Sequence, residues 1–209
     1  MNPVFVTGTG TDVGKTVASA VIALAWEADY WKPVQAGFEE ETDSEMLRRL
    51  MINDDSRVHP ETYKLKLPAS PHIAAQNEGI QIDLNHIKNN QPSVHGYLVI
   101  EGAGGLMVPL NTDEFVIDLI EQLNAKVILV SRNYLGSINH SLLTAELCRQ
   151  RHLDVAGWIF NDEFMNYQNE IAGWSGYPVL GSVPHLKVID KETVRVQSSL
   201  LKDRLLSRL

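Results

Sequence analysis

Short apolar runs rich in β-branched and aromatic residues alternate along the chain with longer stretches of helical periodicity. Buried strands are predicted for the apolar runs, at residues 3–7, 30–34, 97–100, 126–130, 155–160 and 178–184. Helices are predicted for the periodic stretches, at residues 17–28, 44–51, 84–90, 115–123, 137–151, 164–173 and 191–209. This alternation indicates an α/β fold, in which a mostly parallel sheet carries helices on both faces and forms three layers.

Two kinds of segment depart from this regular pattern. Residues 52–82 contain three prolines and are predicted to be mostly loop, with one helical turn at 72–76. A stretch of this length without clear elements is more often functional than idle. Turns are predicted after two of the strands, at residues 35–37 and 101–105.

The residues that directly follow the strands are the first candidates for chemistry, because ligands bind parallel sheets beyond the carboxyl ends of their strands. These candidates are the segment 8–16, Lys32, Glu101, the segment 133–139, Asn161 and Pro184. They are expected to lie along one edge of the sheet.

The first strand leads into a glycine-rich stretch that ends in Gly14-Lys15-Thr16 and opens a helix. This order of elements is the context of a phosphate-binding loop (P-loop). Small residues let backbone N–H groups surround phosphate oxygens, and the helix N-terminus adds partial positive charge. Lys15 is expected to reach the β- and γ-phosphates of a nucleoside triphosphate, and the Thr16 hydroxyl to bind Mg²⁺. The fold is therefore predicted to be P-loop NTPase-like.

The loop misses the usual spacing by one residue, because Thr9 stands where the first glycine is expected. The alternative is a glycine-rich turn between strand and helix with an ordinary surface lysine. The flanking strand and helix and the intact Gly14-Lys15-Thr16 favour the nucleotide site.

Two charged residues at strand ends extend this picture. Lys32 could stabilise a γ-phosphoryl group in transfer, although a solvated lysine at a strand edge is the alternative. Glu101 ends an apolar strand and suits Mg²⁺, whereas a carboxylate that caps a turn is the alternative. Asp43 is one of several acids between residues 39 and 45. Either Asp43 or Thr42 could cap the helix predicted at 44–51, and an N-cap is the default interpretation for Asp43.

Residues 136–140 open a helix after a strand, where free N–H groups suit an anion such as a carboxylate, although an ordinary cap explains Ser137 equally well. His72 and His140 receive no role, because a lone histidine is usually structural. We find no Ser-His-Asp or Cys-His arrangement and no zinc-ligand spacing in the sequence.

Composition narrows the functional classes. With 209 residues the chain can bury a full core, and a single domain over residues 1–209 is expected. The net charge of -8 argues against a general binder of nucleic acid or of acidic membranes. Cys148 is the only cysteine, which excludes an intrachain disulfide. Neither a membrane-spanning stretch nor a leader is visible, so a cytoplasmic location is expected.

Several stretches together resemble the dethiobiotin synthetase family. They are residues 6–16, 31–37, 70–73, 101–105, 135–140 and 156–162, and their order and approximate spacing match from residue 4 to about 185. The elongated P-loop is a trait of that family, so the departure at Thr9 supports the resemblance.

The resemblance implies a reaction in which 7,8-diaminononanoate, CO₂ and ATP give dethiobiotin, ADP and phosphate. One amine forms a carbamate, the carbamate oxygen attacks the γ-phosphate, and the second amine displaces phosphate to close a cyclic urea. An anion that approaches an anionic phosphate needs dense positive charge, which Lys15, Lys32 and Mg²⁺ would supply. The resemblance also implies a homodimer with the substrate site at its interface.

Matched position by position, the resemblance implies the following roles. The active-site lysine is Lys32, and the P-loop lysine is Lys15. The magnesium ligands are Thr16, Asp43 and Glu101. The ATP contacts are Asp12, Val13, Gly14, Lys15, Thr16, Val17, Asp43, Glu101, Gly102, Ala103 and Gly104, then Asn161 and Asp162 beside the adenine, and Val183, Pro184 and His185. The substrate contacts are Ala36 and, for the carboxylate tail across the dimer interface, Gly136, Ser137, Ile138 and Asn139.

This chain departs from the family pattern at three places. Ala36 stands where the family usually has Ser or Thr, so one hydroxyl toward the substrate is lost. The stretch between the first helix and Lys32 is shorter than usual. The region beyond about residue 186 resembles the family only loosely, which bears on the pocket for the nucleotide base.

Two other classes remain as alternatives. A dimeric switch ATPase of the partitioning or septum-placement kind carries an additional lysine near the start of its loop, and residues 7–11 contain none. The basic residues of the last helix, Lys202, Arg204 and Arg208, are better explained by a solvated face than by a membrane or DNA surface. A small-molecule kinase would have no role for Lys32 and no need of the glycine-rich turn after Glu101.

Overall fold

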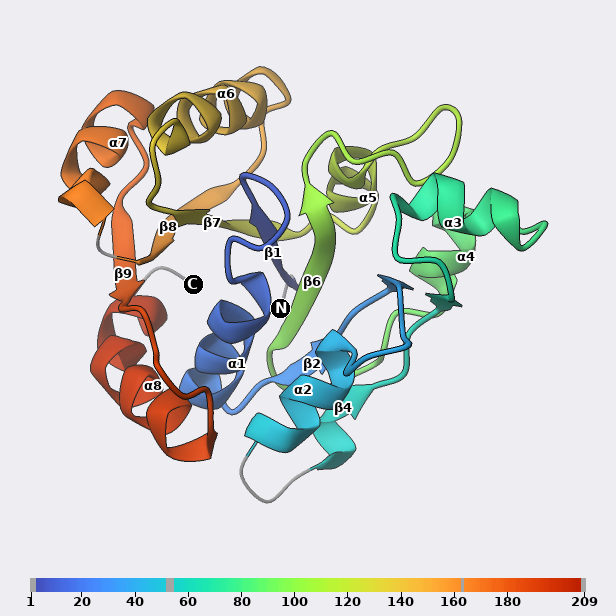
Figure 1. The fold of residues 1–209 in the computed structure, drawn as a ribbon, viewed down its shortest axis with the longest axis horizontal. Helices are drawn as coiled ribbons and strands as arrows, with labels where there is room; N and C mark the ends of the chain where they lie inside the picture. The colour runs from blue at the N-terminus through green and yellow to red at the C-terminus, as the bar shows by residue number, and fades with distance from the viewer. Residues whose placement is uncertain (1–2, 52–54, 163, 208–209) are drawn as a thin grey trace.

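A seven-stranded sheet forms the centre of the computed structural model, which describes residues 3–51, 55–162 and 164–207 (Figure 1). In spatial order its strands are β4 (Val58–His59), β2 (Asp29–Trp31), β6 (Leu98–Gly105), β1 (Val4–Gly8), β7 (Lys126–Arg132), β8 (Val155–Asn161) and β9 (Val179–Val183). Every neighbouring pair is parallel. A second sheet pairs β3 (Val34–Ala36) with β5 (Tyr63–Leu65), again in parallel.

Helices cover both faces of the large sheet, which confirms the predicted three-layer α/β architecture (Figure 1). One face carries α1 (Lys15–Trp26), α2 (Asp43–Leu50) and α8 (Lys191–Leu206). The other carries α3 (Pro71–Asn77), α4 (Leu84–Asn89), α5 (Val116–Gln122), α6 (Ser137–Gln150) and α7 (Gln168–Ser175). Two 3-10 turns, η1 (Asp55–Arg57) and η2 (Phe164–Asn166), complete the elements.

The central strand β1 shows why the apolar runs of the sequence are continuous rather than alternating. Phe5 packs into the cluster formed with α3 to α7, while Val4 and Val6 pack into the cluster formed with α1, α2 and α8. A parallel strand covered on both faces buries all its side chains, so each position favours an apolar residue. Among the described residues, no helix combines the length and the apolar character needed to span a membrane.

Several predicted boundaries are wrong, and the main errors have clear causes. The strand predicted at 30–34 is divided: β2 ends at Trp31 and β3 begins at Val34 in the other sheet, because Pro33 has no N–H for the ladder. The turn predicted at 101–105 is the end of β6, since Gly105 pairs with Gly8 of β1.

The other errors are smaller. The predicted loop 52–82 contains the helical turn foreseen there, as α3, but also the short strands β4 and β5, while its residues 52–54 lie outside the described part. The helix predicted at 164–173 is instead η2 followed by α7, because Met165 and Asn166 have positive φ.

Candidate active site

The loop between β1 and α1 is built as a phosphate-binding loop requires. Gly14 precedes the helix with φ of +87°, in the left-handed region, and a Cβ there would overlap the amide of Asn161. No side chain caps α1 at Gly14, an arrangement that leaves the N–H groups of the first turn open to an anion. Lys15 and Thr16 are the first residues of the helix, and the Lys15 Nζ donates to the Gly10 carbonyl at 2.8 Å.

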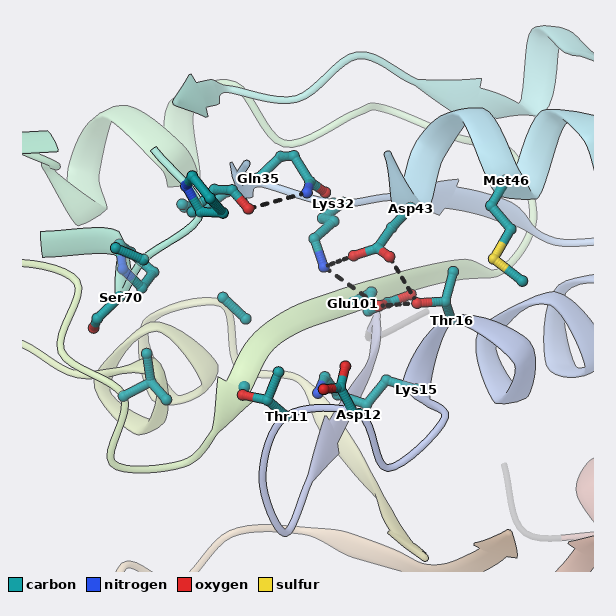
Figure 2. Close-up of a pocket in the computed structure, with 18 of the residues that line it drawn as sticks. Thr11, Asp12, Lys15, Thr16, Lys32, Gln35, Asp43, Met46, Ser70 and Glu101 are labelled. Carbon is teal, nitrogen blue, oxygen red and sulfur yellow. Dashed lines mark hydrogen bonds and ion pairs between the residues drawn. The ribbon is translucent and has the colours of Figure 1, made fainter. Parts of the chain in front are cut away.

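Four side chains from different elements converge beside this loop (Figure 2). The Thr16 hydroxyl lies 2.9 Å from Asp43 Oδ1 and 2.9 Å from Glu101 Oε1. Lys32 forms an ion pair with Asp43 Oδ2, and its Nζ lies 3.3 Å from Glu101 Oε1. In Figure 2 these groups point toward one another, while Thr11, Asp12 and Lys15 face them from the other side of the cavity. The structure thus brings together the predicted magnesium ligands and both candidate catalytic lysines.

Asp43 is not the helix N-cap that its place in an acidic stretch suggested. Thr42 caps α2 by accepting from the Glu45 N–H at 3.2 Å, and Glu45 accepts from the Thr42 N–H at 2.9 Å. This capping box occupies the cap and leaves the Asp43 carboxylate directed toward Lys32. The Thr-x-x-Glu spacing of residues 42–45 was the signal that could have corrected the N-cap interpretation.

Tyr30 also contacts the cluster, and the sequence did not indicate it. Its hydroxyl donates to Glu101 Oε2 at 2.9 Å, and both side chains are buried. Burial, followed by the charge of Glu101, raises the pKa of Tyr30 well above its usual range, so the phenol stays protonated.

The charges of the cluster stabilise one another against burial. Burial by itself acts to lower the pKa of Lys32, but the charges of Glu101 and Asp43 outweigh it and the pKa rises. Burial likewise acts to raise the pKa of Asp43, but Lys32 holds it below its usual value. The Lys32–Asp43 pair is therefore ionised around neutrality. The pKa of Lys15 is lowered, chiefly by burial, although the charge of Glu101 opposes the shift.

The cluster lines a cavity of about 740 Å³. Its wall consists of P-loop residues 11, 12 and 14–17, of Lys32, Gln35, Ala36, Asp43 and Glu101, and of the segments 68–71 and 103–104 with the apolar residues Val34, Met46 and Val108. Ala36, predicted as a substrate contact, lines this cavity. Gly102 is not part of the wall, because its Cα faces the Phe5 ring, and a Cβ placed there would lie 2.6 Å from Phe5 Cε1.

A smaller cavity of about 220 Å³ adjoins the first and shares Asp12, Gly14 and Val17 with it. The remaining predicted nucleotide contacts meet here, namely Val13, Asn161, Asp162, Val183, Pro184 and His185. Asn161 at the end of β8 fixes one wall by donating to the Val13 carbonyl at 2.5 Å. Arg132, Leu186 and Ile189 also line it and were not predicted. The region after residue 186 therefore does shape this cavity.

The predicted carboxylate-tail residues, Gly136 to Asn139, line neither of these cavities. They form the start of α6, where Gly136 and Asn139 are exposed. The Ser137 hydroxyl is buried and has no hydrogen-bond partner in the described part of the chain. Nearby, Leu135 is 86% exposed and Leu143 is 62% exposed. In a single chain this segment therefore does not join the site.

Magnesium fits the oxygen cluster. Thr16 has one hydroxyl hydrogen, so it can donate to only one of the two carboxylate oxygens that lie 2.9 Å away, and the other oxygen pair lacks a hydrogen. A hard cation that prefers carboxylate and hydroxyl oxygens would satisfy both. Among the described residues no group of three or more His, Cys, Asp or Glu side chains is placed to hold a metal.

The residues left without a role remain outside the site. His72 Nδ1 lies 3.0 Å from the Ser70 hydroxyl, and His140 Nδ1 lies 2.5 Å from the Tyr134 hydroxyl. Cys148 is buried in the core, where burial raises the pKa of its thiol to about 12. A thiol of this kind is unreactive, as expected of a core residue.

Sequence comparison identifies similar proteins over nearly the whole chain. A family model described as an AAA domain matches residues 2–193. The ATP-dependent dethiobiotin synthetase of Cytophaga hutchinsonii is 48% identical over 206 residues, covering 97% of this chain and 98% of that protein. The protein of the same name from Christiangramia forsetii is 45% identical over 202 residues, covering 96% of each chain.

Solved structures are similar in fold. A ParA family ATPase from Chlorobium tepidum superposes with a TM-score of 0.56 at 14% identity, covering 100% of this chain and 97% of that one. The septum site-determining protein MinD from Pyrococcus horikoshii gives a TM-score of 0.56 at 12% identity, covering 98% and 94%. At such identities the likeness shows the P-loop NTPase-like fold alone.

Proposed function

Because this chain belongs to the family of ATP-dependent dethiobiotin synthetases, we propose that ATP spans its two adjoining cavities and that the diamine binds beside it in the larger one. The activity of the family is the ATP-dependent closure of a cyclic urea from 7,8-diaminononanoate and CO₂ in biotin biosynthesis. The enzyme is therefore a ligase that forms carbon–nitrogen bonds. The roles of individual residues are our proposal and follow from the geometry of the site.

The nucleotide spans both cavities. Its phosphates lie on the P-loop at the N-terminus of α1, and its base occupies the smaller cavity between Asn161 and the segment 183–185. The two cavities meet at Asp12, Gly14 and Val17, so a single ligand can pass from one to the other. Ala103 and Gly104 line the larger cavity near the phosphate end, whereas the position of Gly102 supports only an indirect role.

Thr16, Asp43 and Glu101 are the proposed ligands of Mg²⁺. When bound, the ion supplies positive charge to the phosphate oxygens. Lys32 adds a second cation, which Asp43 and Glu101 hold in place although it is only 4% exposed. This buried lysine, directed into the larger cavity beside the P-loop, is the observation that carries the proposal.

The proposed reaction proceeds in three steps. One amine attacks CO₂, a nitrogen–carbon bond forms, and a proton leaves to give a carbamate. The carbamate oxygen then attacks the γ-phosphorus, and the bond to the ADP oxygen breaks. The second amine attacks the carbonyl carbon, the carbon–oxygen bond to phosphate breaks, and the amine's proton leaves with the phosphate as the ring closes. Lys15 and Lys32 stabilise the negative charge that accumulates when the carbamate approaches the γ-phosphate.

Phosphate release from ATP is expected to require both the diamine and bicarbonate. Neither substrate alone completes the acceptor, because the attacking oxygen exists only in the carbamate. A continuous phosphate assay with each component omitted in turn measures this dependence. ATP turnover that is indifferent to the diamine would favour a switch ATPase instead.

A homodimer is proposed to complete the substrate site. The start of α6 lines neither cavity, yet it presents an unpartnered buried hydroxyl at Ser137 next to the exposed Leu135. A second copy would cover this apolar surface and bring residues 136–139 to the diamine's carboxylate tail. Sedimentation equilibrium is expected to give a molar mass of two chains for the wild type. For Leu143→Glu it is expected to give the mass of a single chain. A monomeric wild-type protein with full activity would refute this assembly.

Two further expectations stay predictions. Two hydrophobic core clusters lie on the two faces of one large sheet, and this arrangement supports a single domain over residues 1–209. The lone, buried Cys148 supports a reducing, cytoplasmic setting.

A further inference from the structure

Tyr30 lies in the middle of β2, opposite Val99 of β6, and is completely buried. Its side chain is on the face of the sheet that α1 covers, as are Val99 and Val6. Glu101 follows Val99 by two positions, and alternate residues of a strand share a face. The Tyr30 ring therefore points along this face toward the Glu101 carboxylate, and its hydroxyl donates to Oε2 at 2.9 Å.

The two oxygens of Glu101 have different partners. Oε1 lies 2.9 Å from the Thr16 hydroxyl and 3.3 Å from Lys32 Nζ. Oε2 has Tyr30 as its hydrogen-bond partner. Glu101 is only 1% exposed, so water contributes little to holding this carboxylate. A buried carboxylate whose oxygens are bonded on opposite sides cannot rotate freely about its terminal bond.

We propose that Tyr30 is a positioning residue for the magnesium site, because its hydroxyl holds Glu101 with Oε1 directed at Thr16 and Lys32. The inference rests on the proposed role of Glu101 as a magnesium ligand. Outer partners of this kind orient a metal ligand, and their loss typically weakens metal binding by about tenfold or more. Tyr30 itself does not line the cavity and meets its wall only through Glu101.

The competing explanation is that Tyr30 only packs in the core and that its hydroxyl uses Glu101 as a convenient hydrogen-bond acceptor. The adjacent Trp31 shows what such a residue does: it packs on the other face, and its indole N–H donates at 3.2 Å to the backbone carbonyl of Pro60. The Tyr30 hydroxyl instead donates to a side chain that also contacts Thr16 and Lys32. The two explanations differ in one respect, which is whether removing the hydroxyl changes the response to magnesium.

The test compares nucleotide binding with and without magnesium in Tyr30→Phe. Calorimetric titration with a non-hydrolysable ATP analogue gives one Kd in excess Mg²⁺ and one in EDTA. We expect the Kd in EDTA to stay within about twofold of wild type and the gain in affinity from Mg²⁺ to fall about tenfold. Tyr97→Phe is the matched control, because Tyr97 is a half-buried tyrosine just before β6 that packs on Trp26. It should keep the full gain.

Both Kd values come from the same preparation, so a smaller folded fraction alters the binding stoichiometry and not their ratio. The same comparison in a Glu101→Gln background adds a second criterion. If Tyr30 acts through Glu101, Tyr30→Phe should cause no further loss there. An unchanged magnesium gain in Tyr30→Phe, or an equal loss in the Glu101→Gln background, would overturn the role of Tyr30. A wild-type affinity that does not respond to Mg²⁺ would overturn the magnesium site itself.

Discussion

Lys32→Ala is expected to abolish ring closure, with a loss of at least about a thousandfold in turnover. The Lys32 ammonium is buried between Asp43 and Glu101, where its charge is weakly screened. Its removal takes one of two lysine cations from the place where a carbamate must meet the γ-phosphate. Initial rates of phosphate release with diamine and bicarbonate present measure the loss.

A measurement of stability distinguishes the loss of catalysis in Lys32→Ala from a loss of folded protein. Removing one partner of a buried ion pair leaves uncompensated charge, so Lys32→Ala should lower the free energy of unfolding by about 3 kcal/mol without metal. Saturating Mg²⁺ and ADP should restore much of it, because the cation replaces the lost charge between the carboxylates. Lys88→Ala, an exposed lysine on α4, is the control for both measurements. Near-normal turnover in Lys32→Ala would refute the role given to Lys32.

Lys15→Ala is expected to weaken ATP binding by at least about a hundredfold and to reduce turnover further. The Lys15 side chain folds over its own loop, with Nζ bonded to the Gly10 carbonyl, and it lines the cavity proposed to hold the phosphates. Titration with ATP and Mg²⁺ measures the affinity.

Lys15→Arg should not restore binding, although it keeps the charge. The loop encloses the lysine closely, because even a Cβ added at Gly8 would lie only 3.3 Å from Lys15 Cδ. A guanidinium is larger and planar and does not fit where a compact ammonium does. ATP affinity equal to wild type in Lys15→Ala would place the phosphates elsewhere.

The layered fold could be predicted from the sequence because its signal is local. Buried parallel strands are continuous apolar runs, and the helices between them have clear periodicity. Boundaries that depend on distant partners could not be predicted. Residues 102–105, which are three glycines and an alanine, resemble a turn by composition, and only the pairing of Gly105 with Gly8 makes them part of β6.

The residues of the candidate site likewise fall into those that the sequence could predict and those that it could not. Lys15 and Thr16 begin α1, Lys32 follows β2, and Glu101 ends the apolar part of β6, so the topology alone brings them to one edge. Asp43 required the cap at Thr42 to be recognised first. Tyr30 could not be found, since its contact with Glu101 joins positions 71 residues apart and depends on the register of β2 against β6.

The likeness to ParA and MinD structures also shows what the fold leaves open. These ATPases share the fold with this chain, so the switch ATPase considered from the sequence has the same architecture. The distinction lies in the residues, because residues 7–11 lack the extra lysine of that class and Lys32 is present beside the loop. Function therefore follows from the site and not from the fold.

Mass spectrometry of the product formed from isotopically labelled bicarbonate is the most direct test of the ring-closing activity. The enzyme is incubated with 7,8-diaminononanoate, ATP, Mg²⁺ and bicarbonate that carries heavy carbon. We expect a product with the mass of the diamine plus carbon dioxide minus water, and with the label in its urea carbonyl. ATP consumption without this product, or a product that carries phosphate and no label, would contradict it.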